Sequence, residues 1–393
     1  MIVVAVASGT SADGLDVGVY DVAWQPPGEI WMRVLGARTE PWPGDLASAL
    51  LGLLPPAVTT AAELCELDTA VGQTVGRAAR RAIEEICDGR ADLVVSPGQT
   101  VFHDVRDGRC HGTLQLGQPA WVTEATGLPV VSDLRARDVA AGGHGAPLAS
   151  TFDALWLAGE RAVAALNLGG IANVTVVRGD GPPRAWDTGP ANCLLDVAAA
   201  RVTGGRQRFD RDGAIAAGGQ VRGDLLDVLL RHPHFALPPP ASTGREAFSA
   251  QFLDSALASV PALNDGDLLA TLTELTAVSV ARALQEWDVA EVVASGGGTR
   301  NPTLMAALRR ALSPSRLTTS DDRGLPVQAK ETALWALLGF LTWHGLPGTT
   351  GATGAETARV LGRITPGDSP LVLPSPVEQP PTRLVVCGAI DVL

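Results

Sequence analysis

Two apolar strands of this chain run into glycine-containing turns and return at once as strands. The first pair comprises residues 2–7 and 15–20 around the turn Ser8–Gly14, and the second comprises residues 163–168 and 171–177 around Gly169 and Gly170. Glycine tips let backbone N–H groups approach a bound anion closely. One such hairpin opens each half, which predicts two similar lobes that grip one phosphate chain, the layout of a nucleotide-dependent phosphotransferase.

The order of predicted elements repeats between the halves. Apolar runs predict further strands, and helical spacing predicts helices. The strands are expected near residues 31–35, 92–96, 113–116, 128–132, 184–186 and 289–295, and the helices near 61–88, 119–126, 192–202, 225–231, 249–255, 268–287, 302–312 and 329–344. This repetition predicts an internal structural duplication within an α/β fold.

A chain of 393 residues exceeds the size at which one hydrophobic core usually stops growing, so two lobes are expected. We predict an N-terminal lobe over residues 1–162 and a C-terminal lobe over 163–345. Residues 346–393 are rich in Pro and Gly and predict a loop and mobile tail, with a possible terminal strand over 383–387.

Charge and cysteine usage exclude several classes of protein. The net charge of −12 argues against a nucleic-acid surface. Five scattered cysteines without C-x-x-C spacing indicate reduced thiols in a cytoplasm. The apolar N-terminus lacks a basic flank, so we expect a strand there and no signal peptide, and no apolar run reaches membrane-spanning length. A soluble cytoplasmic protein is predicted.

Two carboxylates lie within and just after the first glycine turn. Each glycine turn alone is explained by a tight hairpin connection. Asp13 and Asp16 would repel a phosphate unless Mg²⁺ bridged them to the nucleotide, usually through water. The pair therefore favours a metal–phosphate site at this turn.

A third carboxylate, Asp187, lies in Asp-Thr-Gly-Pro where a predicted strand gives way to a helix. Asp is among the best helix N-caps, so a purely structural role is as well supported as that of a catalytic base. The triple glycine of Gly296–Gly298 leaves a flat backbone for a purine or ribose, and one glycine would be enough for a helix end. A Walker lysine and a nucleophile elbow are both missing from the sequence.

Several motifs, taken together and in order, resemble the anhydro-N-acetylmuramic acid kinase family from residue 1 to about 345. They are Gly9–Asp16, Gly98–Thr100, Ser132–Leu148, Asn167–Asn173, Asp187–Pro190, Ser242–Glu246 and Gly296–Asn301. The resemblance implies the sugar kinase/Hsp70/actin fold, with duplicated ribonuclease-H-like lobes around a central cleft. It also implies a bacterial cytoplasmic transferase of peptidoglycan recycling, acting as a homodimer on a small sugar, without nucleic-acid or membrane partners.

The implied reaction uses ATP, Mg²⁺ and water to convert 1,6-anhydro-N-acetylmuramate into N-acetylmuramate 6-phosphate and ADP. By resemblance, Asp187 takes a proton from the water that attacks the anomeric carbon, and the released O6 accepts the γ-phosphoryl group. Glu331 matches a carboxylate that holds the water and the sugar, although a glutamate in a first helical turn is also favoured by the helix dipole.

The remaining site residues are carried over on the same motifs. Nucleotide-binding residues are Gly9, Thr10, Ser11, Asp13, Gly14, Asp16, Asn167, Gly169, Gly170, Gly296, Gly297, Gly298 and Asn301. Substrate-binding residues are Gln99, Thr100, Arg135, Asp138, Gly142, Gly143, Thr188, Gly189 and Asn192. Mg²⁺ is expected to be bound mainly through ATP and water near Asp13 and Asp16.

The sequence departs from the family pattern around the sugar pocket. Pro97 replaces a usual histidine, Ala241 a lysine, His144 a glutamine and Leu134 a phenylalanine, and the segment 349–355 blurs a usual Pro-Ser-Val-Thr-Gly-Ala ending. Two other interpretations therefore stand beside the main one. One is a kinase for another 1,6-anhydro sugar such as levoglucosan, and the other is a non-catalytic relative that senses a nucleotide or muropeptide.

Overall fold

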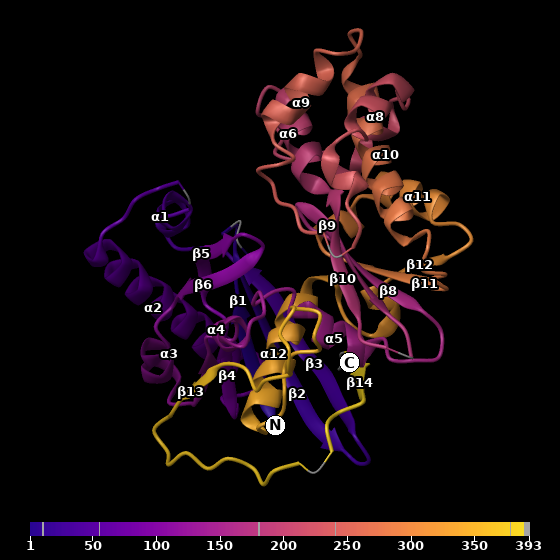
Figure 1. Ribbon diagram of the computed structural model, residues 1–393. Coiled ribbons are helices and arrows are strands. Elements are labelled where there is room, and N and C mark those ends of the chain that lie inside the picture. The colour runs from indigo at the N-terminus through magenta and orange to yellow at the C-terminus, as the bar shows by residue number, and fades with distance from the viewer. Residues whose placement is uncertain (10–11, 55, 180, 240, 378, 389–393) are drawn as a thin grey trace. The chain divides into compact units, whose positions relative to one another are not determined.

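The computed structural model describes residues 1–9, 12–54, 56–179, 181–239, 241–377 and 379–388 and divides into two compact units (Figure 1). The first unit is Met1–Ala158 with Arg323–Leu393, and the second is Gly159–Asp322. Residues 323–345 therefore belong to the first unit, not to the C-terminal lobe in which we expected them. The reason is the long apolar helix α12 (Lys330–Trp343), which packs on strands of the first unit.

The first unit is built on a seven-stranded sheet in the order β13-β7-β4-β1-β2-β3-β14. Its strands are β1 (Ile2–Ala7), β2 (Leu15–Gln25), β3 (Glu29–Glu40), β4 (Leu93–Ser96), β7 (Val130–Ser132), β13 (Arg363–Thr365) and β14 (Arg383–Cys387). β1, β2 and β3 pair antiparallel, whereas β4 and β7 run parallel to β1. A separate ribbon joins β5 (Gln99–Arg106) to β6 (Arg109–Leu116).

The second unit has a five-stranded sheet in the order β10-β9-β8-β11-β12. Its strands are β8 (Val163–Leu168), β9 (Ile171–Val177), β10 (Arg184–Pro190), β11 (Glu291–Ser295) and β12 (Arg316–Thr319). Again the first three strands pair antiparallel and the last two run parallel to the first. The inner five strands of the first unit, β3-β2-β1-β4-β7, follow the same order. This shared topology confirms the predicted duplication of a ribonuclease-H-like lobe.

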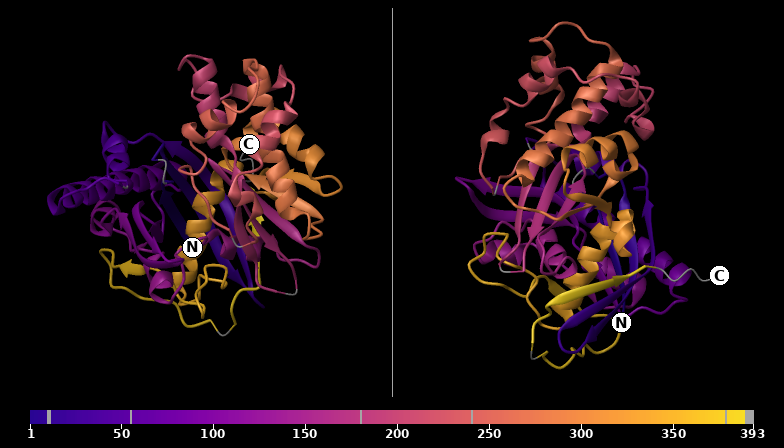
Figure 2. Two further views of the ribbon diagram at one scale, coloured as in Figure 1. Left: turned by 45° about the horizontal axis from the view of Figure 1, so that its top comes forward. Right: turned by 90° about the vertical axis from the view of Figure 1, so that its right-hand side faces the viewer.

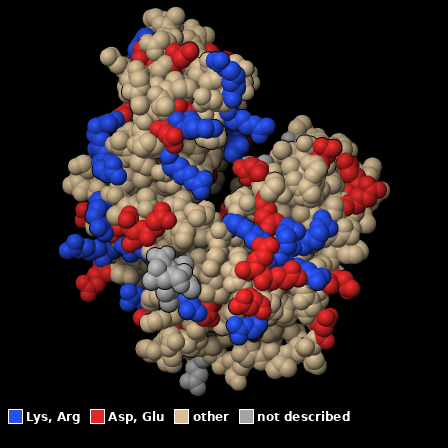
Figure 3. All heavy atoms as spheres, turned by 180° about the vertical axis from the view of Figure 1, so that it is seen from behind, with Lys and Arg blue, Asp and Glu red and all other residues tan. Residues whose placement is uncertain are grey.

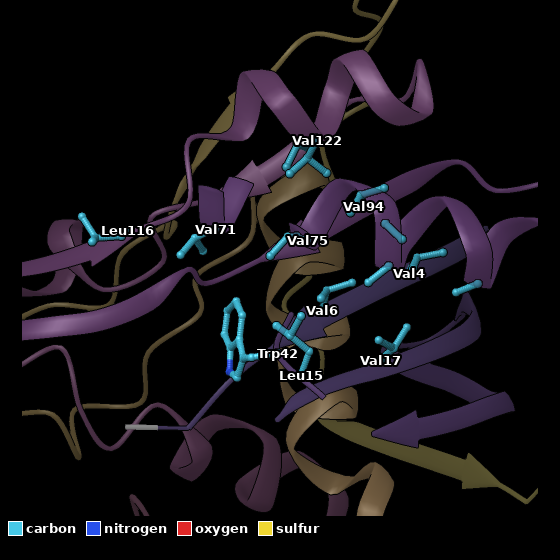
Figure 4. Close-up of a cluster of buried hydrophobic side chains, with 14 of the residues drawn as sticks. Val4, Val6, Leu15, Val17, Trp42, Val71, Val75, Val94, Leu116 and Val122 are labelled. Atoms are coloured by element: carbon cyan, nitrogen blue, oxygen red, sulfur yellow. The ribbon is translucent and has the colours of Figure 1, made fainter. Parts of the chain in front are cut away.

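Both faces of the first sheet are buried. Alternate residues of β1 and β2, including Val4, Val6 and Val17, meet Val71 and Val75 of helix α2 (Ala61–Ile86) in one core (Figure 4). Because successive side chains of a strand point to opposite faces, Val95 of β4 lies on the other face. There a Cβ on Gly339 would lie 2.2 Å from Val95 Cγ2, so only glycine lets α12 pack this closely.

Helices α10 (Asp265–Leu284) and α11 (Pro302–Ala311) cover the second sheet, where Val280 and Leu308 share a core with β8 and β11. A further helical cluster surrounds Leu195, Leu225 and Leu272. It is built by α6 (Asn192–Val202), α7 (Ala214–Ala217), α8 (Gly223–Leu229), α9 (Ala250–Leu257) and one end of α10.

The C-terminal segment is less free than we predicted. β13 pairs antiparallel with β7 at one edge of the first sheet. β14 pairs parallel with β3 at the other edge (Figure 2, right). The terminal strand is thus confirmed over residues 383–387. The prediction of a loop and mobile tail is wrong at β13. Both strands satisfy the hydrogen-bonding groups of an otherwise open sheet edge.

Other predicted elements largely agree with the structure, including α3 (Pro119–Thr126), β8, β9 and α6. The sequence did not predict several short elements. They are the helices α1 (Leu46–Gly52), α4 (Ala136–Ala140), α5 (Ala149–Trp156) and α7, the strands β5, β12 and β13, and the single-turn helices η1 (Arg211–Gly213), η2 (Pro233–Ala236), η3 (Gly297–Arg300), η4 (Ser320–Arg323) and η5 (Val327–Ala329). Among the described residues no helix is long and apolar enough to cross a membrane. Basic and acidic side chains lie next to one another on the face drawn in Figure 3.

Candidate active site

The side chain of Gln99 donates a hydrogen bond to the turn between β1 and β2. The Gly9 carbonyl accepts hydrogen bonds from Ala12 N and Gln99 Nε2, each at 3.1 Å. Gln99 is only 2% exposed, and its Oε1 has no hydrogen-bond partner among the described residues. Gln99 therefore supports the predicted phosphate turn directly, whereas the predicted residues Thr10 and Ser11 lie outside the described residues.

Asp13 is exposed and Asp16 is half-buried at this turn. Thr39 Oγ1 donates to Asp16 Oδ1 at 2.6 Å, and the side chain of Thr39 also fills the space beside Gly14. Burial raises the pKa of Asp16, the Thr39 hydrogen bond lowers it, and the negative charge of Asp13 raises it again. Within the described ranges no three His, Cys, Asp or Glu side chains group as metal ligands, so a cation here would rely on water and a ligand.

Glu331 lies in the first turn of α12, and buried contacts on its neighbours fix that turn. The hydroxyl of Tyr20 donates to the Ala329 carbonyl at 2.9 Å and lies 2.6 Å from Thr332 Oγ1. Lys330 Nζ lies 2.9 Å from Asp153 Oδ1, with side chains 12% and 3% exposed. These anchors hold the backbone on both sides of Glu331.

The side chain of Glu331 reaches solvent, although protein atoms crowd around it. This partial desolvation raises the pKa of its carboxyl, and the negative charge of Asp16 adds to the rise, while Trp335 and Arg135 act in the opposite sense. The charges of Asp16 and Arg135, both in the first unit, thus act on the Glu331 carboxyl. The position in a first helical turn fits the helix-dipole interpretation as well.

The segment 133–147 is organised by a buried carboxylate. Asp138 is 0% exposed, and its Oδ2 accepts from Gly145 N and its Oδ1 from Thr353 Oγ1, both at 2.7 Å. A Cβ on Gly143 would lie 2.3 Å from Asp138 Oδ2, so glycine is required there. Both oxygens of this predicted substrate residue are engaged within the protein, so Asp138 shapes the loop.

Arg135 and Thr100 are both held by contacts within the first unit. Arg135 Nη1 donates to the Gly145 carbonyl at 2.6 Å, and its guanidinium lies 5.2 Å from the Trp335 ring centroid. Thr100 Oγ1 accepts from Gln115 Nε2 at 3.3 Å. Gly142 has φ +88, which favours glycine, and a Cβ there would meet no atom within 4 Å.

Asp187 sits near the end of β10, where the strand register shifts between Asp187 and Gly189. Its backbone N–H donates to the Ala241 carbonyl at 2.8 Å, and its own carbonyl accepts from His234 Nε2 at 3.0 Å. Its carboxylate Oδ2 accepts from Thr243 N at 2.9 Å. Asp187 therefore caps no helix: α6 begins at Asn192, with Ala191 as its N-cap residue.

The electrostatics of Asp187 follow from this setting. Burial raises the pKa of its carboxyl, the Thr243 N–H and the nearby His234 lower it, and Glu246 raises it. Oδ1 makes no hydrogen bond with any residue that the structure describes. One oxygen is thus fixed by the backbone, and the other is available to a ligand or a water molecule.

The next two predicted substrate residues are tightly packed. Thr188 is 4% exposed and donates through Oγ1 to the Ala172 carbonyl at 3.2 Å. Gly189 has φ +138, and a Cβ there would lie 2.6 Å from Phe235 Cε1. Both residues therefore shape the strand that presents Asp187.

The β8–β9 hairpin and the start of α6 are tied together. Asn192 Nδ2 donates to the carbonyls of Leu168 at 3.0 Å and Gly169 at 2.7 Å, and the backbone N–H groups of Asn192 and Cys193 donate to Gly169 and Gly170. These bonds orient the glycine tip. The amide nitrogen of the predicted substrate residue Asn192 is used within the protein.

The triple-glycine loop adjoins this hairpin. A Cβ on Gly296, which has φ +86, would lie 2.7 Å from Asn167 Oδ1, and a Cβ on Gly298 would lie 2.7 Å from Leu168 Cβ. Gly297 is exposed, and a Cβ there would meet no atom within 4 Å. Asn301 Oδ1 accepts from Leu304 N at 3.0 Å as the N-cap of α11. The triple-glycine loop therefore packs against the β8–β9 hairpin, which carries the other predicted nucleotide-binding residues of the second unit.

The chain is similar to known proteins over most of its length. A family model described as "Anhydro-N-acetylmuramic acid kinase" matches residues 1–367. A protein of that name from Streptomyces coelicolor is 50% identical to this chain, and the match covers 99% of this chain and 100% of the relative. Another from Rhodococcus erythropolis is 49% identical, and the match covers 93% of this chain and 94% of the relative. A relative from Bordetella pertussis is 41% identical over 92% of this chain and 95% of its own length.

The chain belongs to the anhydro-N-acetylmuramic acid kinase family. This membership confirms the resemblance drawn from the motifs and makes the protein a kinase.

Two departures from the pattern of the anhydro-N-acetylmuramic acid kinase family meet in the structure. His144 N donates to the Thr353 carbonyl at 2.9 Å, so the altered loop position contacts the altered segment 349–355. Leu134 is 0% exposed, Ala241 is 7% exposed and Pro97 is buried. The changed residues are thus part of the packing around the loops, and several of them carry backbone contacts.

Sequence reasoning missed the residues that hold the anhydro-N-acetylmuramic acid kinase motifs in place. Tyr20, Asp153 and Lys330 anchor the start of α12, and His234 anchors the backbone of Asp187. Their partners are remote in sequence, so no local pattern revealed them. The motif Ser242–Glu246 was noticed, and its Thr243 proves to bond Asp187.

Proposed function

We propose that this protein uses ATP, Mg²⁺ and water to convert 1,6-anhydro-N-acetylmuramate into N-acetylmuramate 6-phosphate and ADP. The family supplies the class of reaction, and the Asp187 carboxylate is the observation that carries the chemistry. One of its oxygens accepts the Thr243 N–H at 2.9 Å, which leaves the other free to take a proton.

Asp187 acts in this proposal as the general base. Burial raises the pKa of its carboxyl, which makes the ionised form a stronger base. The backbone bonds to Ala241 and His234 hold the strand, so the free oxygen keeps its direction. Water deprotonated by Asp187 attacks the anomeric carbon, the bond from that carbon to O6 breaks, and O6 accepts the γ-phosphoryl. Proton transfer of this kind contributes roughly 10²–10⁴-fold to a rate.

Three carboxylates of the first unit have further roles in the proposed reaction. Glu331 holds the water and the sugar, on a helix start fixed by Tyr20 and Lys330. Asp13 and Asp16 fit a Mg²⁺ ion bound chiefly through phosphate oxygens and water, because two carboxylates alone make an incomplete ligand set. The ion would neutralise negative charge on the transferring phosphoryl group.

The nucleotide residues divide between the two glycine turns. In this proposal the nucleotide is bound by residues of the glycine turns and of the triple-glycine loop. These residues are Gly9, Thr10, Ser11, Gly14, Asn167, Gly169, Gly170, Gly296, Gly297, Gly298 and Asn301. The predicted sugar residues are Gln99, Thr100, Arg135, Asp138, Gly142, Gly143, Thr188, Gly189 and Asn192, of which Asp138 and Asn192 act through the loops they hold. We also propose that the protein is a cytoplasmic homodimer that works in peptidoglycan recycling and has no nucleic-acid or membrane partner.

Asp187→Asn tests the assignment of the base. The amide keeps the size of the side chain and the Thr243 contact but cannot accept the proton, so we expect turnover to fall about 10²–10⁴-fold. ATP affinity, measured by calorimetry, should remain that of the parent protein. Asp227→Asn, at an exposed carboxylate of α8 in the same unit, is the matched control and should leave turnover unchanged. Substantial residual turnover in Asp187→Asn would exclude Asp187 as the base.

A further inference from the structure

Arg245 lies directly on the glycine tip of the β8–β9 hairpin. A Cβ built on Gly170 would lie 2.6 Å from Arg245 Nε, 2.8 Å from Nη2 and 3.0 Å from Cζ. The guanidinium therefore occupies the space that any side chain at position 170 would need. A Cβ on Gly169 would meet only ordinary contacts at 3.5 Å, so the close approach of Arg245 is specific to Gly170.

The segment that carries Arg245 also holds the candidate base. Thr243 N donates to Asp187 Oδ2 at 2.9 Å, and Arg245 follows two residues later. Ala241, at the start of the same segment, accepts the Asp187 N–H at 2.8 Å. One short stretch of chain thus connects the Asp187 carboxylate to the hairpin that is expected to bind phosphate.

The charge of Arg245 is available to a ligand. Its side chain is exposed, and among the described residues no hydrogen bond or ion pair engages the guanidinium. Its charge acts on Asp196, whose pKa is raised to about 6 by burial and lowered in part by Arg245, and on the thiol of Cys193, whose pKa it also lowers in part. Five N–H donors in a rigid fork match phosphate oxygens well.

The sequence offers no second lysine that could provide positive charge in place of Arg245. Lys330 is the only lysine in the sequence, and it is paired with Asp153 in the first unit. A phosphoryl transfer needs positive charge on the group that moves, and kinases often supply it with a lysine or arginine. Because the lysine is engaged elsewhere, Arg245, which lies against the glycine tip of the β8–β9 hairpin, is a source of this positive charge.

We propose that Arg245 contacts the terminal phosphates of the nucleotide and stabilises the phosphoryl group during its transfer to the sugar. This inference rests on the proposed function. In the transfer step the O6–phosphorus bond forms, the bond from phosphorus to the β,γ-bridging oxygen breaks, and that oxygen leaves as part of ADP. Arg245 neutralises the negative charge on the phosphate oxygens while these bonds change, and Gly170 is the residue whose missing side chain lets it do so.

The kinetic test uses Arg245→Ala and Arg245→Lys in the full-length protein. We expect Arg245→Ala to lower kcat/KM for ATP by about 10²–10³-fold, the effect of removing one preorganised donor. The KM for the sugar should stay near that of the parent protein, and Arg245→Lys should retain part of the activity. Added guanidinium ion should restore part of the turnover of Arg245→Ala. Arg309→Ala, at an exposed arginine in the last turn of α11, is the matched control and should behave like the parent.

The opposite kinetic pattern would overturn the proposal. A raised KM for the sugar with unchanged kcat and unchanged ATP dependence would place the carboxylate of the sugar's lactyl group on Arg245. A kinetic profile equal to that of Arg309→Ala would give Arg245 no role in the reaction.

A second variant covers the case in which Arg245→Ala fails to fold. Gly170→Ala places a methyl group where the guanidinium lies and forces this flexible side chain to shift, so kcat/KM for ATP should fall in the same direction as in Arg245→Ala, by a smaller factor. Combined with Arg245→Ala or Arg245→Lys, it should add little, because contacting residues are not additive. Full additivity would contradict the arrangement.

A binding measurement separates this proposal from the proposed function. Affinity for ADP and for a non-hydrolysable ATP analogue, measured without sugar, should fall in Arg245→Ala whether or not the sugar identity is right. Absence of turnover in the parent protein would count against the proposed reaction, whereas equal nucleotide affinity in parent and variant would count against Arg245.

Discussion

The two units share one strand order and differ in what the repeated hairpin carries. In the first unit the turn after β1 bears Asp13 and Asp16, and in the second the turn after β8 is Gly169 and Gly170. One turn therefore suits a cation with its water, and the other suits direct approach of backbone and of Arg245 to an anion. Duplication of the fold has left two glycine turns with unlike chemistry.

The elements added to the shared sheet also differ between the two units. The C-terminal segment closes both edges of the first sheet with β13 and β14, whereas a cluster of helices around α6 and α10 enlarges the second unit. The helix α12, with Glu331 in its first turn, belongs to the first unit, and Asp187 belongs to the second. Each unit thus holds one of the two candidate catalytic carboxylates.

A buried ion pair is the sharpest stability difference between the units. Lys330 and Asp153 are 12% and 3% exposed, whereas Arg316 of the pair with Glu291 in the second unit is 70% exposed. Lys330→Met leaves the Asp153 carboxylate buried without its partner and should lower the free energy of unfolding by about 3–5 kcal/mol. Arg316→Met should cost about 0–1 kcal/mol, since exposed pairs contribute little.

Urea unfolding followed by hydrogen exchange assigns each loss to a unit. The double variant Lys330→Met with Asp153→Leu should recover much of the loss, because no unpaired charge remains. Equal effects of Lys330→Met and Arg316→Met would show that burial does not distinguish the two pairs.

The edge strand of the first unit gives the next largest effect. Leu384 of β14 is 1% exposed, so Leu384→Ala should destabilise the docking of β14, at the lower end of the about 2–5 kcal/mol known for such changes. Amides of β3 that face β14 should then exchange faster with solvent. Leu373→Ala, at a residue 49% exposed in the same segment, should change stability by less than about 0.5 kcal/mol. Unchanged exchange in β3 would argue that β14 does not protect this edge.

The smallest expected effect is a pH dependence in the second unit. Burial raises the pKa of Asp196 to about 6, above the ordinary value of about 3.9 for an unfolded chain. The folded form therefore binds the proton more tightly, and the stability that this proton confers is lost as pH rises from about 4 through 6. Asp196→Asn should flatten this part of the curve of unfolding free energy against pH, whereas Asp227→Asn should not. The same slope in parent and Asp196→Asn would refute the assignment.

Local signals in the sequence predicted much of the fold. Pro at the start of α3 and glycine at the tip of the β8–β9 hairpin mark element ends that agree with the structure. The pairing of β13 and β14, and the unit to which α12 belongs, depend on contacts between residues far apart in the chain. The spacing of apolar residues along the chain carries no information on such contacts. β5 was missed because a two-stranded ribbon, with residues such as His103 exposed, lacks a continuous apolar face.

The candidate site was predictable in its residues but not in its supports. Asp187 was found from its place between a strand and glycine, yet the sequence left a helix cap and a base equally supported. The structure removes the helix-cap interpretation, because α6 begins at Asn192. Thr243, His234 and Arg245 reach Asp187 and Gly170 from a distant segment, which only the folded chain reveals.

Product analysis tests the central claim most directly. The protein is incubated with ATP, Mg²⁺ and either 1,6-anhydro-N-acetylmuramate or levoglucosan in ¹⁸O-labelled water, and ADP and sugar phosphate are measured at early times by mass spectrometry. We predict ADP formation with the muramate, with one heavy oxygen in the sugar 6-phosphate and none in ADP. Turnover with levoglucosan alone, a phosphorylated product that has gained no water, or no turnover with either sugar would contradict the account.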